Sequence, residues 1–287
     1  MNEFETFLAA WAMPDPFYER ILGEKKNAPV RALLRSQEDG WLAGIPFAQQ
    51  AAQALKVEAH WEKRSGEKIE AGKTIGRFHG NPESILKLEN LLIGLIAKPS
   101  GIATAGRRAI EVAGGKIRLV CGGWKKYPFT IREGVREAVA AGGLEPRMLN
   151  RPFLYLDKNY VRIFGGIAQT LRAVAHDPSA KVIQVRGEYG PIEQETQEAI
   201  RNGAQVIMVD TGSWEDLDRV LRVMRQEKPL PKIQIAFAGG IRIQDIPDLV
   251  KKGVDILDIG AAILDAPWLE LSYDIVKEGN GSAGRNR

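Results

Sequence analysis

Two short turns near the carboxyl end of the chain carry the residue types that a phosphate site needs. The apolar run at 233–238 ends in Gly239 and Gly240, and the run at 254–259 ends in Gly260 and Ala261. Glycine allows close approach to the backbone because it has no Cβ, and a helix that follows aims its first free N–H groups at the same spot. The spacing leaves two interpretations open: a double cradle for one phosphate, or two ordinary strand-to-helix turns.

Charged side chains follow the other apolar runs of this half of the chain. In chain order, the candidates with the neighbouring aromatic residue are Trp124, Lys125, Lys126, Lys158, Arg186, Glu188 and Asp210. Lysine, arginine and carboxylates together suit a phosphorylated sugar with a metal ion, or an anionic aromatic acid. Each charge alone could be a solvated loop residue, whereas several around one opening favour a binding site.

The elements that position these residues alternate regularly beyond Gly101. Strands are predicted near 117–121, 153–156, 182–186, 206–209, 233–237 and 255–259, and helices near 130–141, 164–175, 192–202, 214–225, 244–251 and 267–277. Continuous apolar strands that alternate with helices indicate a parallel sheet covered by helices. A barrel and a doubly wound sheet both fit six or seven such units, and a barrel gathers its site at the carboxyl ends of its strands.

The first hundred residues follow a different pattern. Residues 1 to about 30 are predicted to be mostly helical, and short strands with glycine turns follow between 30 and 78, interrupted by a helix at about 46–55. A long helix is predicted at about 81–97, opened by an asparagine cap and a proline in its first turn. This half is therefore predicted to be a small α+β domain.

Composition narrows the class of protein. The chain has 287 residues, 44% hydrophobic and 26% charged, which is typical of a globular enzyme. No apolar run approaches the ~18 residues of a membrane helix, and the first residues lack the order of a signal peptide. A single cysteine and three scattered histidines predict no intrachain disulfide and no metal-ligand spacing, and they fit a reducing cytoplasm. The net charge of +4 is equally compatible with nucleic acid and with a cationic pocket for a small anion, but no nucleic-acid motif accompanies it.

A set of motifs in order, between about residues 30 and 277, resembles the quinolinate phosphoribosyltransferase family, the type II phosphoribosyltransferases. The motifs are EDGWLAG at 38–44, SGIAT at 100–104 with Arg107, Lys125 with Pro128, Gly142 and Gly143 with Arg147, Lys158 with Asn159, IMVD at 207–210, AGGI at 238–241, GVDILDIGA at 253–261 and Ala266 with Pro267. The resemblance implies an N-terminal α/β sandwich domain (1–100), an open six- to seven-stranded α/β barrel (101–265), and a C-terminal helix and tail (266–287) that packs on the N-terminal domain. It also implies a homodimer or hexamer with shared active sites, and no nucleic-acid or membrane partner.

The resemblance further implies a reaction in which phosphoribosyl passes from PRPP, with Mg²⁺, to quinolinate, releasing pyrophosphate and carbon dioxide. Gly239, Gly240, Gly260 and Ala261 match the family's 5′-phosphate turns, and Asp210 matches its acidic residue near ribose and metal. Lys125 and Arg147 match two cationic residues. Lys125, Asp210 and Glu188 are thus the expected catalytic groups, with Asp210 and Glu188 on the metal. Trp124, Lys126, Arg147, Lys158 and Arg186 are expected to bind substrate.

Several motifs depart from the family at the chemistry. The family's Asp-Thr-Arg-Lys-Thr is here GGWKK at 122–126, so Trp124 replaces an arginine that binds carboxylate. Trp124 could stack on an aromatic ring or anchor its loop. The acidic Glu-Val-Glu strand is here Gln184-Val-Arg186, the lysine and aspartate of Lys-Asp-Asn-His are exchanged at Asp157 and Lys158, and the helix Glu-Arg is Glu-Asn at 89–90. The loss of two charge-assisted contacts of about 1.5–3 kcal/mol each would lower the binding affinity for quinolinate by two to four powers of ten.

Three functions remain open at this stage. The first is phosphoribosyl transfer to quinolinate or to another aromatic or heteroaromatic acid, an interpretation that includes the homologue associated with molybdenum transport. The second is a non-catalytic sensor of a nucleotide or sugar phosphate, which the loss of the acidic strand favours. The third is a decarboxylase that uses the same cationic mouth without PRPP.

Overall fold

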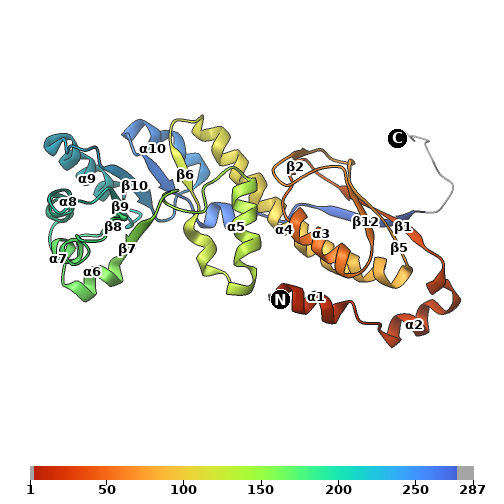
Figure 1. Ribbon diagram of the computed structural model, residues 1–287. Helices are drawn as coiled ribbons and strands as arrows, with labels where there is room; N and C mark the ends of the chain where they lie inside the picture. The colour runs from red at the N-terminus through yellow and green to blue at the C-terminus, as the bar shows by residue number, and fades with distance from the viewer. Residues whose placement is uncertain (1–2, 277–287) are drawn as a thin grey trace. The chain divides into compact units, whose positions relative to one another are not determined.

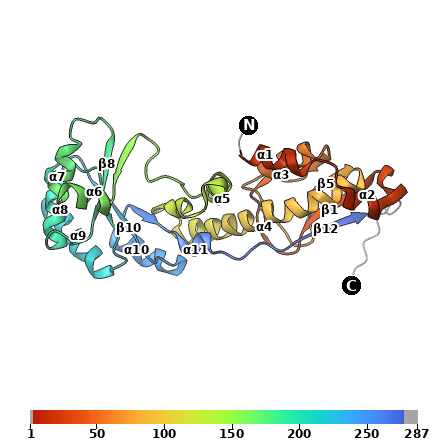
Figure 2. The same ribbon diagram turned by 90° about the horizontal axis from the view of Figure 1, so that it is seen from below.

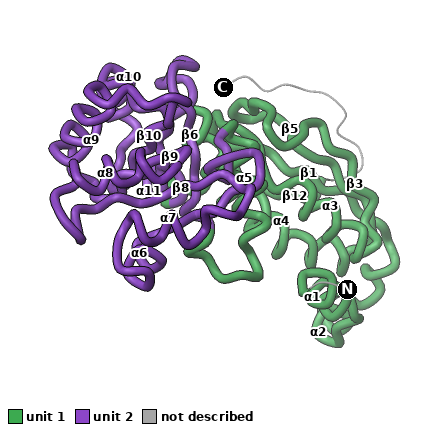
Figure 3. Tube along the Cα trace, turned by 60° about the vertical axis from the view of Figure 1, so that its left-hand side comes forward, with its two compact units in different colours: residues 1–107, 125–143, 265–287 green, residues 108–124, 144–264 purple. Residues whose placement is uncertain are grey.

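The computed structural model describes residues 3–276, which fold into two compact units shown in different colours in Figure 3. Unit 1 is formed by Met1–Arg107, Lys125–Gly143 and Asp265–Arg287, and unit 2 by Arg108–Trp124 and Leu144–Leu264. The chain therefore leaves unit 1 and returns to it twice. The domain limits expected at 100 and 265 follow sequence motifs and stay a prediction.

Unit 1 is an antiparallel sheet with helices on one face (Figures 1 and 2). Its strand order is β12-β1-β5-β3, formed by β1 (Val30–Ser36), β3 (Glu58–Trp61), β5 (Thr74–Gly80) and β12 (Leu271–Val276). The covering helices are α3 (Ile45–Ala54) and α4 (Pro82–Ala113). Alternate residues of β1, such as Ala32 and Leu34, are fully buried against Leu88 and Leu92 of α4 in one apolar core.

Smaller elements complete unit 1. They are α1 (Glu3–Trp11), α2 (Pro16–Leu22), η1 (Gly23–Asn27), the two-stranded sheet of β2 (Gly40–Trp41) and β4 (Lys68–Ile69), η3 (Phe129–Ile131) and α5 (Arg132–Ala141). Leu8 of α1 joins the same core as the sheet. The expected helical lead-in, and a small domain that mixes helices with short strands, are both confirmed.

Unit 2 is a curled six-stranded parallel sheet with helices on its outer face (Figure 1). The order is β6-β11-β10-β9-β8-β7, from β6 (Arg118–Val120), β7 (Phe153–Leu156), β8 (Ala180–Val185), β9 (Val206–Val209), β10 (Gln234–Ala238) and β11 (Ile256–Asp258). The helical elements are α6 (Lys158–Phe164), α7 (Ile167–Ala173), α8 (Ile192–Arg201), α9 (Trp214–Glu227), η4 (Ile243–Asp245), α10 (Ile246–Lys252) and α11 (Ala261–Leu264). A further short element, η2 (Gly122–Lys126), begins in unit 2 and ends in unit 1.

The sheet of unit 2 curls around an apolar interior. Val182, Val206, Met208, Ala236 and Ile256 are fully buried in one cluster that spans four neighbouring strands. A sheet that curls around an apolar interior differs from a flat doubly wound sheet, whose two faces both carry helices. The predicted open α/β barrel is therefore confirmed, with six strands.

The prediction of a helix at 267–277 is wrong. Residues Leu271–Val276 form β12, which pairs antiparallel with β1 from Arg31↔Val276 to Ser36↔Leu271. The apolar residues that pack on the core of unit 1 are Leu269, Leu271 and Tyr273, a period of two that belongs to a strand. The segment therefore joins the N-terminal sheet as an edge strand.

The long helix also extends further than predicted, to Ala113 instead of about 97. Pro99 lies inside it and removes the N–H that would bond to the carbonyl of Leu95. That carbonyl faces Gly44, where a Cβ would lie only 1.9 Å from its oxygen. The helix continues through the proline because a neighbouring backbone without a side chain packs on the exposed carbonyl.

Candidate functional site

The residues expected to do chemistry in unit 2 lie along one edge of its sheet, which we call the mouth: the segments that directly follow the six strands. Because all six strands are parallel, their carboxyl ends share this edge. The register places Ala238 beside Asp258, and Val209 beside both Phe237 and Val185. Glu188, Arg186, Asp210, the two glycine turns and Trp124 therefore follow neighbouring strands, as the sequence predicted.

Asp210 lies at the centre of a hydrogen-bond network. Its Oδ2 accepts from Gln184 Nε2 at 2.9 Å, and the same amide nitrogen lies 3.1 Å from Tyr155 Oη. Arg186 Nη1 donates to the main-chain oxygen of Asp210 and lies 3.5 Å from its Oδ2. Burial raises the pKa of Tyr155, so its hydroxyl keeps its proton. Among the described residues, Oδ1 of Asp210 has no hydrogen-bond partner, which leaves one oxygen for a ligand.

Glu188 forms the second half of this network. Its two oxygens each accept from Arg162 of α6 at 2.8 Å, and Oε1 lies 3.4 Å from Arg186 Nε. The hydrogen bonds from Arg162 hold the pKa of Glu188 below its usual range, so the carboxylate is ionised at neutral pH. Arg186 is thereby placed between two carboxylates, Asp210 and Glu188.

A buried carboxylate fixes the loop that carries Arg186 and Glu188. Glu195, in the first turn of α8, is only 3% exposed. Its Oε2 accepts from the backbone N–H groups of Arg186 and Gly187 at 2.8 Å each, and its Oε1 accepts from Tyr189 at 2.9 Å. Three charge-assisted bonds to one side chain fold the loop back on its own helix.

The two glycine turns differ in what their missing side chains make room for. At Gly239, with φ +107°, a Cβ would lie 2.7 Å from the backbone of Gly212, so the space is filled by the next loop and not by a ligand. Gly240 and Gly260 face open space. Among the described residues, the N–H groups of Gly240, Gly260 and Ala261 have no hydrogen-bond partner. The missing Cβ therefore leaves no room for a ligand at Gly239, whereas Gly240 and Gly260 do leave such room.

Trp124 is held in place by its loop. Its indole Nε1 donates to the carbonyl oxygen of Pro146 at 2.7 Å, and the side chain is half-buried. Beside it, Gly122 N donates to Asp258 Oδ1 at 2.9 Å, and a Cβ at Gly122 would lie 3.0 Å from Oδ2 of that carboxylate. Asp258 thus ties the end of β11 to the start of the Trp124 loop. The bond to Pro146 favours the anchoring role of Trp124.

The remaining cationic candidates differ in their surroundings. Lys158 joins the Asp210 network through its main chain, because its N–H donates to Gln184 Oε1 at 2.8 Å. The side chain of Lys158 is exposed at the start of α6, while Asp157 caps that helix by accepting from Asn159 N at 2.9 Å. The exchange of lysine and aspartate at 157–158 therefore supplies a helix cap. Arg147 is exposed, its guanidinium 5.5 Å from the ring of Phe153. Lys125 and Lys126 belong to unit 1, where both are exposed.

Five residues of this region were not expected as part of a site: Tyr155, Arg162, Gln184, Glu195 and Asp258. Gln184 could have been found from the sequence, because a polar residue inside an otherwise apolar buried strand needs a partner. Asp258, at the end of a buried strand, carries the same signal. Tyr155 and Glu195 resemble ordinary strand and helix residues, and only the folded structure shows what they contact.

Cys121, at the end of β6, is a buried thiol and not a reactive one. It is fully buried, and burial, with a smaller contribution from Asp258, raises its pKa to about 12. Because the thiolate is the nucleophile, we expect native protein at pH 8 to react with a thiol reagent at least about a hundredfold more slowly than denatured protein. Colour release from a disulfide reagent, with and without guanidinium, measures this. A fast native reaction would contradict the burial.

The donor set does not fit a magnesium ion held by the protein. Among residues 3–276 no three histidine, cysteine, aspartate or glutamate side chains gather as a metal site. The two expected metal ligands, Asp210 and Glu188, are each bound by arginine. Magnesium needs several oxygen ligands in a near-octahedral shell, whereas Arg162 occupies both oxygens of Glu188 and only Oδ1 of Asp210 is left without a donor among the described residues.

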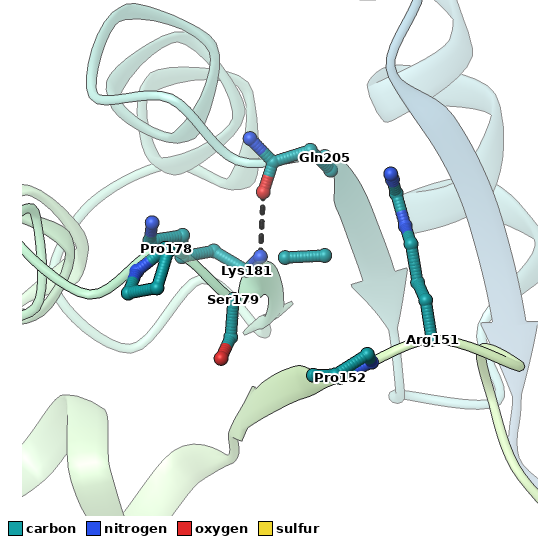
Figure 4. Close-up of a pocket in the computed structure, with 7 residues that line it drawn as sticks. Arg151, Pro152, Pro178, Ser179, Lys181 and Gln205 are labelled. Carbon is teal, nitrogen blue, oxygen red and sulfur yellow. Dashed lines mark hydrogen bonds between the residues drawn. The ribbon is translucent and has the colours of Figure 1, made fainter.

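Two pockets of unit 2 lie at the opposite edge of the sheet, before the strands begin. One, of about 350 Å³, is lined by Arg151, Pro152, Pro178, Ser179, Ala180, Lys181 and Gln205 (Figure 4). The other, of about 410 Å³, lies between α9 and α10 and includes Met224 and Leu230. Gln205 Oε1 accepts from Lys181 N at 2.5 Å, a hydrogen bond between two residues that line the first pocket. The amino ends of barrel strands serve stability, and neither pocket touches the mouth.

Comparisons with known proteins cover nearly the whole chain. The family models of the N-terminal and C-terminal domains of quinolinate phosphoribosyl transferase match residues 12–100 and 102–274. A probable nicotinate-nucleotide pyrophosphorylase (carboxylating) of Synechocystis is 28% identical over 95% of this chain and 96% of its own length. The human nicotinate-nucleotide pyrophosphorylase (carboxylating) is 26% identical over 86% of this chain and 82% of its own.

Solved structures agree on the fold. The nicotinate-nucleotide pyrophosphorylase of Francisella tularensis superposes with a TM-score of 0.77 at 22% identity, over 96% of this chain and 97% of that one. A NadC deletion mutant gives a TM-score of 0.78 at 20% identity, over 94% and 95%. Within the described part of the chain, no helix is long and apolar enough to cross a membrane.

Proposed function

Because the chain belongs to the quinolinate phosphoribosyl transferase family, we propose that it transfers phosphoribosyl from PRPP to quinolinate or a closely related aromatic acid. The C1–oxygen bond to pyrophosphate breaks, the acceptor nitrogen bonds to C1, and the product loses carbon dioxide when the acceptor is quinolinate. The observation that carries this proposal is the mouth itself, where carboxylates and open glycine turns follow neighbouring parallel strands. The sensor and decarboxylase alternatives gain no support from the relatives.

Asp210 is the group proposed to face the reacting sugar. Its Oδ2 is fixed by Gln184, and Oδ1 is available to a ligand. A positioned carboxylate stabilises the positive charge that develops on the sugar as pyrophosphate departs. Glu188, ionised beside Arg162, adds to the negative field of the mouth.

Phosphate and acceptor would be held by different parts of the chain. The N–H groups of Gly240, Gly260 and Ala261 are proposed to receive the 5′-phosphate, with Gly239 shaping the turn. The residues proposed to bind the acceptor are the cations Lys125, Lys126, Arg147 and Lys158, together with Trp124. All four cationic side chains are exposed, as binding of an anionic acid requires. We further propose that the active chain is a homodimer or hexamer in the cytoplasm, with neighbouring subunits completing each site.

Magnesium is proposed to act as the partner of the PRPP diphosphate. It would supply charge neutralisation for the leaving group. In the protein, arginine side chains pair with Asp210 and Glu188 in place of a metal ion. The proposed role of the two carboxylates is to orient the sugar and exclude water.

The test is calorimetric titration with PRPP and magnesium, then quinolinate, while pyrophosphate release is followed. We expect PRPP to bind and pyrophosphate to appear once the acceptor is added. Nicotinate and other pyridine carboxylates, assayed in the same way, define the acceptor class. PRPP binding without release for any of them would contradict transfer, and absence of PRPP binding would contradict the phosphoribosyl function altogether.

Asp210→Asn is expected to reduce the rate of pyrophosphate release by about tenfold to a hundredfold, because a charge-assisted contact of roughly 1.5–3 kcal/mol is lost at the sugar. The effect should fall on kcat and leave the KM for PRPP nearly unchanged. Asp248→Asn is the matched control: this carboxylate is exposed on α10 and pairs with Lys251 of the same helix. Equal rates for the two variants would show that Asp210 has no part in the reaction.

A further inference from the structure

Arg186 occupies a position in the mouth where a cation is expected. Its Nη1 donates to the main-chain oxygen of Asp210 and lies 3.5 Å from Oδ2, and its Nε lies 3.4 Å from Glu188 Oε1. Side-chain exposure is 30% for Arg186, 34% for Asp210 and 29% for Glu188, so all three groups remain accessible to a ligand. One guanidinium therefore bridges the two carboxylates that could have held a metal.

The bridge is held from two further sides. Arg162 donates hydrogen bonds to both carboxylate oxygens of Glu188 at 2.8 Å, and Glu195 accepts one from the backbone N–H of Arg186 at 2.8 Å. Gln184 occupies Asp210 Oδ2 at 2.9 Å. A divalent ion entering this network would find only Asp210 Oδ1 without a donor among the described residues and would have to displace Gln184 or Arg162 to gain a second oxygen. It would also lie beside two guanidinium groups of like charge.

We propose that Arg186 takes the place of a protein-bound divalent cation in this mouth. Its fixed positive charge neutralises Asp210 and Glu188, and the protein without substrate holds no magnesium there. The exposed part of the guanidinium then meets the anionic ligand directly, as arginine does with phosphate oxygens. The proposal rests on the proposed function for the identity of that ligand, a sugar diphosphate, and its test uses no substrate.

The experiment is titration of the substrate-free protein with Mn²⁺, followed by the loss of the free-ion signal in electron paramagnetic resonance. Wild-type protein is expected to bind no manganese at the mouth. Arg186→Glu removes the guanidinium and adds a third carboxylate beside Asp210 and Glu188, so it should bind one ion per chain at a manganese concentration at least about a hundredfold below any at which wild type binds. Arg186→Gln, which removes the charge without adding a ligand, should be intermediate.

Two further variants locate the effect. Arg201→Glu makes the same change of charge at the end of α8, away from the mouth, and is expected to behave as wild type. Adding Asp210→Asn to Arg186→Glu should abolish the manganese site. Far-ultraviolet circular dichroism and a melting curve accompany each variant, so that a misfolded protein is recognised and Arg186→Gln carries the test in its place.

Two results would overturn the proposal. One is stoichiometric manganese binding by wild-type protein that Asp210→Asn removes, because the metal site would then exist beside Arg186. The other is a folded Arg186→Glu protein that binds no more manganese than Arg201→Glu, because Arg186 would not be occupying a cation position. Neither result depends on transfer activity, which pyrophosphate release tests separately.

Discussion

Replacing Glu195 with alanine is expected to lower the free energy of unfolding by about 3–5 kcal/mol, because three backbone N–H groups lose a buried charged acceptor at once. The N–H groups are those of Arg186, Gly187 and Tyr189, each within 2.9 Å of the carboxylate. The loop they belong to carries Glu188, so ligand affinity at the mouth should fall together with stability. Urea unfolding followed by circular dichroism measures the first effect, and PRPP titration below the unfolding range measures the second.

The same helix offers controls for this prediction. Glu193→Ala removes an equivalent carboxylate whose nearest cation, on Arg219, lies 3.9 Å away, and should change stability by less than about 0.5 kcal/mol. Glu195→Gln keeps one acceptor oxygen of the two, so it should lower the free energy of unfolding by about half as much as Glu195→Ala does. If Glu195→Ala were no less stable than Glu193→Ala, the loop would have to be held by other contacts.

Gly239→Ala is expected to cost about 2–4 kcal/mol of stability and to displace the turn after β10. The new methyl group would lie 2.7 Å from the N and Cα of Gly212, which are backbone atoms and cannot rotate away. The φ of +107° adds strain for any residue with a side chain. Because the displaced turn includes Gly240, we also expect weaker binding of phosphate compounds, which titration with ribose 5-phosphate would measure.

Gly240→Ala separates conformational strain from the clash. Gly240 has φ +67°, and no heavy atom lies within 4 Å of the place that a Cβ would take, so the substitution should cost only about 1 kcal/mol. A Gly239→Ala protein as stable as Gly240→Ala would mean that the loop of Gly212 moves aside freely.

The strands of unit 2 could be predicted because their sequence signal is continuous. Buried parallel strands such as residues 206–209 consist of apolar residues alone, and helices with a polar face separate them. The final segment was harder, since Leu269, Tyr273 and Val276 also suit a helix spacing. Its pairing with β1 depends on a partner elsewhere in the chain, which local spacing does not reveal.

The candidate site was predicted in location but not in connectivity. Residues that follow parallel strands must share an edge, so Asp210 and Glu188 could be placed at the mouth from sequence alone. Which groups pair there depends on side-chain directions and loop paths. Arg186 was expected to bind substrate, and its contacts with Asp210 and Glu188 became visible only in the folded chain.

The pairing of β12 with β1 has a consequence for synthesis. Arg35 and Asp274, which bond across these strands, lie 239 residues apart, and the whole of unit 2 is made between them. A ribosome completes β1 long before its partner exists, so one edge of that sheet stays unpaired while unit 2 emerges. Unpaired strand edges promote association between chains. The exposed Arg31 on β1 and Arg77 on neighbouring β5 provide charge on this sheet during the interval.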